Sequence, residues 1–293
     1  MKVGLIGTGL MGQPMALRLL QADETVIVYN RTPSKLEPLI VAGAVTANSP
    51  TELFTDAEVI ILMLSDAVAI NDVLDSVGDS SINEISGKTI IQMGTISPQE
   101  SQRINQQVTE AGGSYLEAPV LGSIPQVKTG ELIVMVGSTP EQFQQWQTLL
   151  KHYSPQPMHI GAVGTASAMK LALNQLIAGL TSTFALSLGL VKQQGVDVEQ
   201  FMTVVRESAL YAPTFDKKLT RMQEGNFANP NFPTKHLLKD TNLFLDQAKQ
   251  SGLDTSGLTG IKTLIEKAIA LGLADQDYSA IYQAVNENSA SDQ

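Results

Sequence analysis

The stretch Val3-Gly4-Leu5-Ile6-Gly7-Thr8-Gly9-Leu10-Met11-Gly12 carries the pattern that decides the fold of the first half of this chain. A short apolar run, typical of a buried strand, passes directly into a G-x-G-x-x-G turn, and the turn opens the helical stretch 13–20. The motif alone arises by chance in many chains. In this strand–turn–helix context it is specific and predicts a dinucleotide-binding site.

Each glycine of the turn has its own role in such a site. The first makes the tight turn, the second lets the backbone approach a pyrophosphate, and the third lets the helix pack closely on the strand. The anion then lies on the unpaired N–H groups at the start of the helix. We therefore predict cofactor contacts at Gly7, Gly9, Leu10, Met11 and Gly12.

Short β-branched runs alternate with helical stretches through the first 160 residues or so. The predicted strands are residues 3–6, 25–29, 58–64, 89–92, 114–118 and 132–136. Continuous apolar runs such as 59–64 suit strands that are buried on both faces of a parallel sheet covered by helices. The pattern predicts an α/β domain of the doubly wound Rossmann type over residues 1–162.

The strand signals stop after Gly161 and Gly164. A long helical pattern runs over residues 165–194, and shorter ones follow at 197–207, 212–223, 234–251, 258–272 and 278–287. We therefore predict an all-helical second domain over residues 163–293, beginning with a long interdomain helix and ending in a frayed tail at 288–293. Apolar residues on several sides of the long helix indicate a homodimer or homotetramer.

Composition excludes several classes of protein. The 293 residues include 19 Lys and Arg against 29 Asp and Glu, a formal net charge of −10, and no cysteine. That charge, without any basic run, is unlike a nucleic-acid-binding protein. No cysteine means no disulfide scaffold, thiolate metal site or cysteine nucleophile, and the three histidines have no metal-ligand spacing. With no membrane span or signal peptide in the pattern, we expect a cytoplasmic, soluble protein without a bound metal.

The end of the second strand indicates which nicotinamide cofactor is bound. An NAD site usually has an acidic residue about 20 positions after the glycine turn, where it binds the ribose hydroxyls. Here Asn30 stands 18 positions after Gly12, followed by Arg31, Thr32 and Lys35. A cationic, hydroxyl-rich turn without a carboxylate suits a 2′-phosphate. We therefore predict that these residues bind NADP(H) rather than NAD(H).

Two further strand ends should line the same crevice, because ligands of open α/β sheets bind beyond the carboxyl ends of the strands. Leu64 and Ser65 follow the third predicted strand, and Thr95 follows the fourth. From position alone, Thr95 either binds the nicotinamide end of the cofactor or caps the next helix.

The start of the long helix carries a candidate acid. Lys170 and Asn174 are four positions apart and project from the same helical face, which also carries Leu173 and Ile177. A lysine on a partly apolar face is desolvated, which lowers the proton affinity of its amine and readies it for proton transfer. An exposed, solvated helix lysine is the alternative.

Four segments, in this order, resemble the signature motifs of the β-hydroxyacid dehydrogenases. They are the glycine fingerprint, Glu117-Ala118-Pro119-Val120-Leu121-Gly122-Ser123, the Gly161-x-x-Gly164 lead into Lys170 and Asn174, and Phe232-Pro233-Thr234-Lys235-His236-Leu237-Leu238-Lys239-Asp240. The resemblance covers essentially the whole chain. Within the family, Asn30-Arg31-Thr32 and the Gly122-Ser123 pair are most similar to the glyoxylate/succinic semialdehyde reductase branch.

The resemblance implies a role for each matching residue. Lys170 would be the general acid that protonates the carbonyl oxygen, and Asn174 would hold the lysine or the substrate. The substrate carboxylate would lie at Leu121, Gly122 and Ser123. Lys239 would reach the cofactor, while Phe232 and Asp240 would close the site from the helical domain.

Three positions depart from the family pattern. Leu121 stands where a serine is common, which removes a hydroxyl from the substrate carboxylate site. Ala166 stands where a third glycine is usual, and Glu117 replaces the commoner aspartate, a change that we expect to be neutral.

The first functional hypothesis is NADPH-dependent reduction of short carboxylate-bearing aldehydes, glyoxylate to glycolate and succinic semialdehyde to 4-hydroxybutyrate. An alternative is oxidation of a 3-hydroxy acid such as 3-hydroxyisobutyrate, since the same residues serve both directions. A third, of another class, is a non-catalytic NADP-binding scaffold, against which the intact Lys170 and Asn174 argue.

Overall fold

The computed structural model describes residues 1–78 and 83–286. Two compact units divide the chain after Lys170. The sequence places the domain boundary at residues 162 and 163, whereas the units divide inside the helix that begins at Thr165. The reason is that the first turn of this helix is hydrogen-bonded to the sheet of the first unit. The predicted frayed tail, 288–293, lies outside the described residues.

One sheet organises the first unit. Among the described residues its order is β3-β2-β1-β4-β5-β6-β8-β7, and β9 pairs with β8. The strands are β1 (Lys2–Ile6), β2 (Thr25–Tyr29), β3 (Val45–Thr46), β4 (Val59–Leu62), β5 (Thr89–Gln92), β6 (Ser114–Glu117), β7 (Val120–Leu121), β8 (Ile133–Gly137) and β9 (Met158–Gly161). The order reverses direction at β1 and β4, both of which run parallel, so a crevice opens beyond their carboxyl ends.

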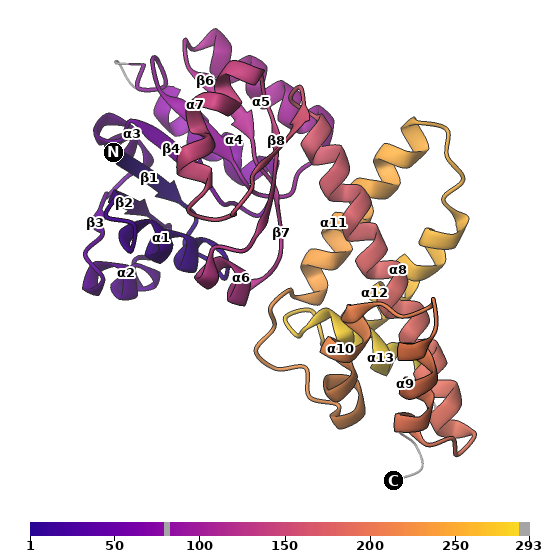
Figure 1. Ribbon diagram of the computed structural model, residues 1–293. Helices are drawn as coiled ribbons and strands as arrows, with labels where there is room; N and C mark the ends of the chain where they lie inside the picture. Colours follow the sequence, from indigo (N-terminus) through magenta and orange to yellow (C-terminus); the bar gives the residue numbers. More distant parts are fainter. Residues whose placement is uncertain (79–82, 287–293) are drawn as a thin grey trace. The chain divides into compact units, whose positions relative to one another are not determined.

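The central strands are buried on both faces. Val59 and Ile61 of β4 point into one hydrophobic core, and Ile60 and Leu62 point into another on the opposite face. Helices cover both faces (Figure 1). They are α1 (Gly12–Leu20), α2 (Glu37–Val41), α3 (Pro50–Asp56), α4 (Ala67–Gly78), α5 (Pro98–Glu110), α6 (Ile124–Thr129) and α7 (Pro140–Leu150), with a 3₁₀ turn at Pro33–Lys35. The predicted doubly wound α/β architecture is confirmed.

Three strands were missed by the sequence pattern, and the sheet is not wholly parallel. β3 and β7 have only two residues each, too few for an alternating pattern. β9, Met-His-Ile-Gly, has little β-branched character. β8 runs antiparallel to β6 and β7, which the order of strands and helices along the chain did not indicate.

The second unit is helical, as predicted. It contains most of α8 (Thr165–Gln193), then α9 (Val198–Glu207), α10 (Pro213–Glu224), α11 (Thr234–Gln250), α12 (Ser256–Ala270), a 3₁₀ turn at Tyr278–Ala280 and α13 (Ile281–Val285). Ala178 of α8 packs with Leu237 of α11 and Ile265 of α12 in one core, while Phe184 stacks on Phe215 in another. The predicted helix 278–287 is therefore a 3₁₀ turn followed by a short α-helix, and its last position lies outside the described residues.

A buried ion pair fixes the start of α11. Lys218 Nζ donates to both carboxylate oxygens of Asp277 at 2.8 Å, and burial lowers the pKa of the lysine. The N–H of Asp277 donates to the carbonyl of Phe227, and the N–H of Tyr278 to the carbonyl of Phe232. The segment leading into α11 is thus held against a buried carboxylate whose charge is compensated.

Helix α8 is the longest element, with 29 residues. By length and composition it is the one helix among the described residues that could cross a membrane, with 44% of its most apolar window buried. A core helix of a soluble protein passes the same test, so this is weak evidence for a membrane span.

The glycine turn gives the first testable prediction. A Cβ on Gly12 would overlap the carbonyl oxygen of Gly7, whose φ is +99°, whereas a Cβ on Gly9 would meet nothing within 4 Å. Gly12→Ala should therefore lower the free energy of unfolding by about 3 kcal/mol, since the backbone must shift. Gly9→Ala, the matched control, should change it by less than about 0.5 kcal/mol. Calorimetric unfolding of both variants checks this, and equal effects would contradict the geometry.

Candidate active site

A pocket of about 340 Å³ lies at the carboxyl ends of β1, β2 and β4. It is lined by Ile6, Gly7, Tyr29, Asn30, Arg31, Thr32, Lys35, Pro50, Leu64, Ala69, Asp72, Val73 and Ser76. The switch point of the sheet is where an open α/β fold binds its ligand, and the volume suits part of a dinucleotide. Of the predicted cofactor residues, the pocket brings together Gly7, Asn30, Arg31, Thr32, Lys35 and Leu64.

One wall of the pocket was not anticipated from the sequence. It is formed by α4, through Ala69, Asp72, Val73 and Ser76. Their spacing of three, four and seven positions is that of one helical face, and α4 follows the strand β4 that ends at the switch point. That spacing is the signal that could have found them.

Asn30 forms hydrogen bonds with both the glycine loop and the cationic segment 31–35. Its Nδ2 donates to Thr8 Oγ1 at 2.8 Å, and its Oδ1 accepts the Thr32 N–H at 2.8 Å. Thr8 is buried, so the amide is anchored on the sheet side. Asn30 therefore occupies the position of the usual ribose carboxylate and fixes the backbone that presents Arg31 and Thr32.

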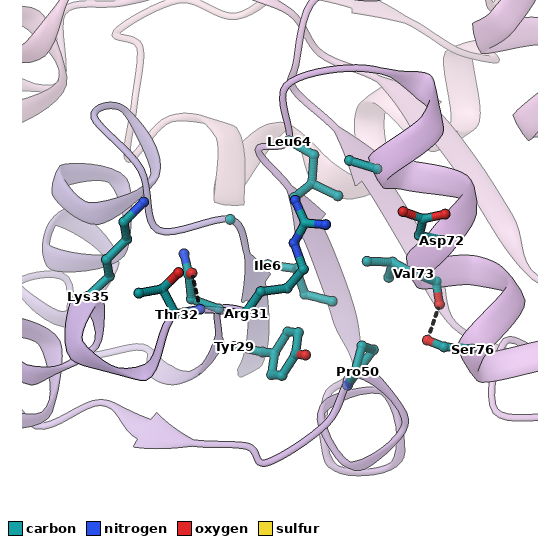
Figure 2. A pocket seen from close by; sticks show the side chains of 13 residues that line it. Ile6, Tyr29, Arg31, Thr32, Lys35, Pro50, Leu64, Asp72, Val73 and Ser76 are labelled. Carbon is teal, nitrogen blue, oxygen red and sulfur yellow. Dashed lines mark hydrogen bonds between the residues drawn. The ribbon is translucent and has the colours of Figure 1, made fainter.

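The charged side chains of the pocket lie on different walls. Arg31 and Lys35 are both exposed, and Figure 2 shows Arg31 extending towards Leu64, Lys35 beyond Thr32, and Asp72 on the α4 wall. The two cations offer N–H donors to an anion at the end of β2.

The remaining glycine-loop residues lie beside the pocket, at the start of α1. Among the described residues, no side chain caps this helix, and its first turn contains no carboxylate. The N–H groups at this end therefore carry a partial positive charge that no side chain of the helix compensates, which makes it a suitable place for a pyrophosphate. Gly9, Leu10 and Met11 precede this helix end, and Gly12 is its first residue.

Of the two other predicted strand-end residues, Ser65 donates its hydroxyl to Asp66 at 2.7 Å, and Asp66 accepts the Ala69 N–H at the start of α4. Thr95 is not the cap of α5. That role belongs to Ser97, which forms a capping box with Glu100, so the capping alternative for Thr95 is wrong. Its cofactor contact stays a prediction.

Lys170 and Asn174 are both buried, with 8% and 2% of their surfaces exposed, so the alternative of a solvated helix lysine is wrong. Within the second unit, Asn174 Nδ2 donates to Asp240 Oδ2 at 2.6 Å. Asp240 is itself buried, and its Oδ1 is 3.0 Å from Lys239 Nζ. The structure thus joins three residues that the resemblance singled out, with Asp240 orienting the amide of Asn174.

Phe232 precedes α11 and lies near His236, with ring centroids 6.3 Å apart. Burial lowers the pKa of His236, and the positive charge of Lys239 lowers it further, so this imidazole is neutral at pH 7. His236 is a packing residue of the helical unit.

The segment predicted to hold the substrate carboxylate has an internal partner. Leu121 ends β7, Gly122 has a φ of +134°, and Ser123 precedes α6. Both the N–H and the hydroxyl of Ser123 donate to Oε1 of Gln126, at 2.9 and 2.8 Å. The Gln126 amide oxygen therefore accepts hydrogen bonds from the two Ser123 donors that the family resemblance assigned to the substrate carboxylate.

Glu117 has a larger role than the sequence indicated. Its buried carboxylate accepts hydrogen bonds from the first turn of α8, through the N–H groups of Ala166 and Ser167 at 2.9 and 3.0 Å. Ala166, another of the three departures from the family pattern, is fully buried at this contact. No group of three or more His, Asp or Glu side chains in the described part of the chain could hold a metal ion.

Known proteins match both units. The family model for the NAD binding domain of 6-phosphogluconate dehydrogenase matches residues 2–161, and the model for NAD-binding of NADP-dependent 3-hydroxyisobutyrate dehydrogenase matches residues 164–285. The solved structure of Mycobacterium tuberculosis 3-hydroxyisobutyrate dehydrogenase with L-serine has a TM-score of 0.86 at 22% identity, covering 97% of this chain and 98% of that one, and so shares the fold.

Two curated relatives from Arabidopsis thaliana are similar along the chain. Glyoxylate/succinic semialdehyde reductase 1 is 30% identical over 285 residues, which are 97% of this chain and 98% of that protein. Glyoxylate/succinic semialdehyde reductase 2, chloroplastic, is 31% identical over 283 residues, 97% and 79% of the two chains. With the nucleotide pocket and the buried lysine in place, the chain belongs to the β-hydroxyacid dehydrogenase family, in the glyoxylate/succinic semialdehyde reductase branch, and is an oxidoreductase that acts on CH–OH groups with a nicotinamide cofactor.

Proposed function

We propose that this enzyme reduces short carboxylate-bearing aldehydes with NADPH, converting glyoxylate to glycolate and succinic semialdehyde to 4-hydroxybutyrate. The burial of Lys170, one helical turn before Asn174, is the observation that carries the proposal. Burial disfavours the charged form of an ammonium and so makes it a better proton donor, and reduction of a carbonyl needs a proton donor at the oxygen. The names of the two plant relatives support these substrates.

The residues around the pocket fit a phosphorylated cofactor. Arg31, Thr32 and Lys35 would bind the 2′-phosphate, because the neutral Asn30 puts no carboxylate at the end of β2 and the one carboxylate among the lining residues, Asp72, lies on the opposite α4 wall. The start of α1 would bind the pyrophosphate, with Ser65 and Thr95 further along the strand ends. Lys239, on α11, stays a predicted cofactor contact from the family motif. The bound nicotinamide supplies the hydride.

The test of cofactor choice is Arg31→Ala. It should raise the Kd of NADPH roughly 10- to 100-fold, because a charge-assisted hydrogen bond to phosphate is lost, and change the Kd of NADH by less than about threefold. Arg103→Ala, which removes another exposed arginine, from α5, is the matched control and should alter neither. Cofactor fluorescence titration measures all of these constants. An equal rise in the Kd of NADPH and of NADH would contradict the assignment of Arg31 to the 2′-phosphate.

The proposed chemistry needs one proton from the protein. As hydride adds to the carbonyl carbon, negative charge develops on the oxygen, and the Lys170 ammonium stabilises it and transfers its proton to it. Asn174, held by Asp240, would fix the orientation of the lysine or the substrate. The substrate carboxylate would take the place of the Gln126 amide oxygen at Gly122 and Ser123. Leu121 would make this part of the site apolar, and Phe232 stays a predicted substrate contact from the family motif.

Lys170→Ala tests the catalytic role, and Lys170→Met tests it with less loss of packing. Each should lower kcat about 10²- to 10⁴-fold, because the proton donor is removed, while the Kd of NADPH stays within about threefold. Lys192→Ala, at an exposed lysine of the same helix, should leave kcat unchanged. Stopped-flow rates with glyoxylate measure the effect, and full activity of Lys170→Met would exclude lysine as the acid.

A second candidate is oxidation of a 3-hydroxy acid of the 3-hydroxyisobutyrate type. It is supported by the description of the family model that matches residues 164–285. In this direction the neutral amine of Lys170 accepts the hydroxyl proton as hydride leaves the carbon. The cationic turn at Arg31 favours reduction, since it suits the phosphorylated cofactor.

We also propose that the enzyme works in the cytoplasm as a homodimer or homotetramer. Leu176, Leu180, Leu186 and Leu190 are between 37% and 63% exposed on one broad side of α8. A second copy covering this side would bury them. Light scattering should therefore give a mass of at least twice 31.4 kDa, and Leu186→Glu should lower it. A monomeric wild-type protein would contradict this.

A further inference from the structure

The carboxylate of Glu117 binds the start of the helix that carries Lys170. Glu117 is the last residue of β6 and is completely buried. Its Oε1 accepts the N–H groups of Gly164, Ala166 and Ser167 at 2.8, 2.9 and 3.0 Å. Its Oε2 accepts the hydroxyl of Ser167 at 2.6 Å and also the hydroxyl of Ser101.

These bonds use the groups that a helix start leaves without partners. The first N–H groups of an α-helix have no intrahelical acceptor, and the helix end has a partial positive charge. The carboxylate satisfies three of these N–H groups at once, and the Thr165 N–H donates to the Ala162 carbonyl. A buried carboxylate without such donors would be strongly destabilising, so the strand end and the helix start hold each other in place.

The other side of the carboxylate is fixed as well. Ser101 Oγ lies 2.8 Å from the Tyr115 hydroxyl, and because its single proton goes to Glu117, Tyr115 is the donor of this bond. Burial raises the pKa of Tyr115, with a further contribution from the charge of Glu117, so the phenol stays protonated. A Cβ on Gly137 of β8 would overlap the Glu117 carboxylate, so the carboxylate lies directly against a backbone position that is free of a side chain.

Lys170 follows Ser167 by three residues, less than one turn of α8. A tilt or unwinding of the first turn therefore moves the lysine directly. Misplacing a catalytic group by about 1 Å can cost about a hundredfold in rate. We propose that Glu117 is a positioning residue for the reaction: through the first turn of α8, its buried carboxylate sets the place of the Lys170 ammonium. This inference rests on the proposed function of Lys170.

The test is Glu117→Gln, which keeps the length of the side chain but replaces the charged acceptor Oε2 with an NH₂ group. Single-turnover hydride transfer from NADPH to glyoxylate, per NADPH-binding site, should fall roughly 10- to 100-fold, while the Kd of NADPH stays within about threefold. The isotope effect on kcat with NADPH deuterated at the transferred position should rise, because chemistry becomes rate-limiting in every folded molecule. Loss of folded protein alone would leave the isotope effect unchanged.

Two further variants serve as controls for Glu117→Gln. Ser101→Ala keeps every bond between Glu117 and α8 and should slow hydride transfer by less than about threefold. Asp197→Ala removes the carboxylate that caps α9, a helix start without a proposed role, and should change neither the hydride-transfer rate nor the isotope effect.

Amide hydrogen exchange gives a readout that needs no aldehyde. In Glu117→Gln the amides of residues 164–170 should exchange at least tenfold faster than in the wild type, and those of α1 should not change. Unchanged exchange at 164–170 would overturn the proposal whether or not the enzyme reduces glyoxylate. Faster exchange with an unchanged hydride-transfer rate and isotope effect would also overturn it, since the contact would then be structural only. A wild type without aldehyde reduction would instead refute the proposed function.

Discussion

The structure of the first unit depends on a buried carboxylate at the junction of a strand and a helix. Glu117 ends β6, and its oxygens take up the N–H groups at the start of α8. Because those donors would otherwise be buried without partners, the long helix begins where the sheet provides the acceptor. The boundary between the compact units accordingly falls inside α8 and not before it.

The nucleotide half of the site depends on a different constraint, the meeting of parallel strand ends at one edge of the sheet. β1, β2 and β4 deliver the glycine loop, the cationic turn and Leu64 to a single pocket. A chain with a net charge of −10 does not attract anions at long range, so under the proposed function the local donors at Arg31, Lys35 and the start of α1 would determine the affinity for the cofactor. This explains how an acidic protein can hold a polyanionic cofactor.

Local patterns were sufficient for much of the fold and for part of the site. The run from Val3 to Gly12 predicts β1, the turn and α1, because all of its information lies within a few neighbouring residues. The Glu117 contact was missed because it joins residues 47 to 50 positions apart. A change from Asp to Glu also looks neutral in the sequence, which does not show the N–H groups that donate to the carboxylate. The hydrogen bond between Ser123 and Gln126 was missed for another reason. The signature motif indicated that the Ser123 N–H binds a ligand, whereas in the structure it donates to the Gln126 side chain in the first turn of α6.

The central claim is that a dinucleotide pocket with a cationic end and a buried lysine together make an NADPH-dependent aldehyde reductase. The most direct measurement is a set of initial rates for the wild-type enzyme with glyoxylate and succinic semialdehyde under NADPH and NADH, beside the oxidation of 3-hydroxyisobutyrate with NADP and NAD. We expect kcat/KM for the better aldehyde to be at least about tenfold higher with NADPH than with NADH, as one charge-assisted phosphate contact implies, and to exceed that of hydroxy acid oxidation. A preference for NADH, faster hydroxy acid oxidation, or no oxidation of NADPH by either aldehyde would contradict the account.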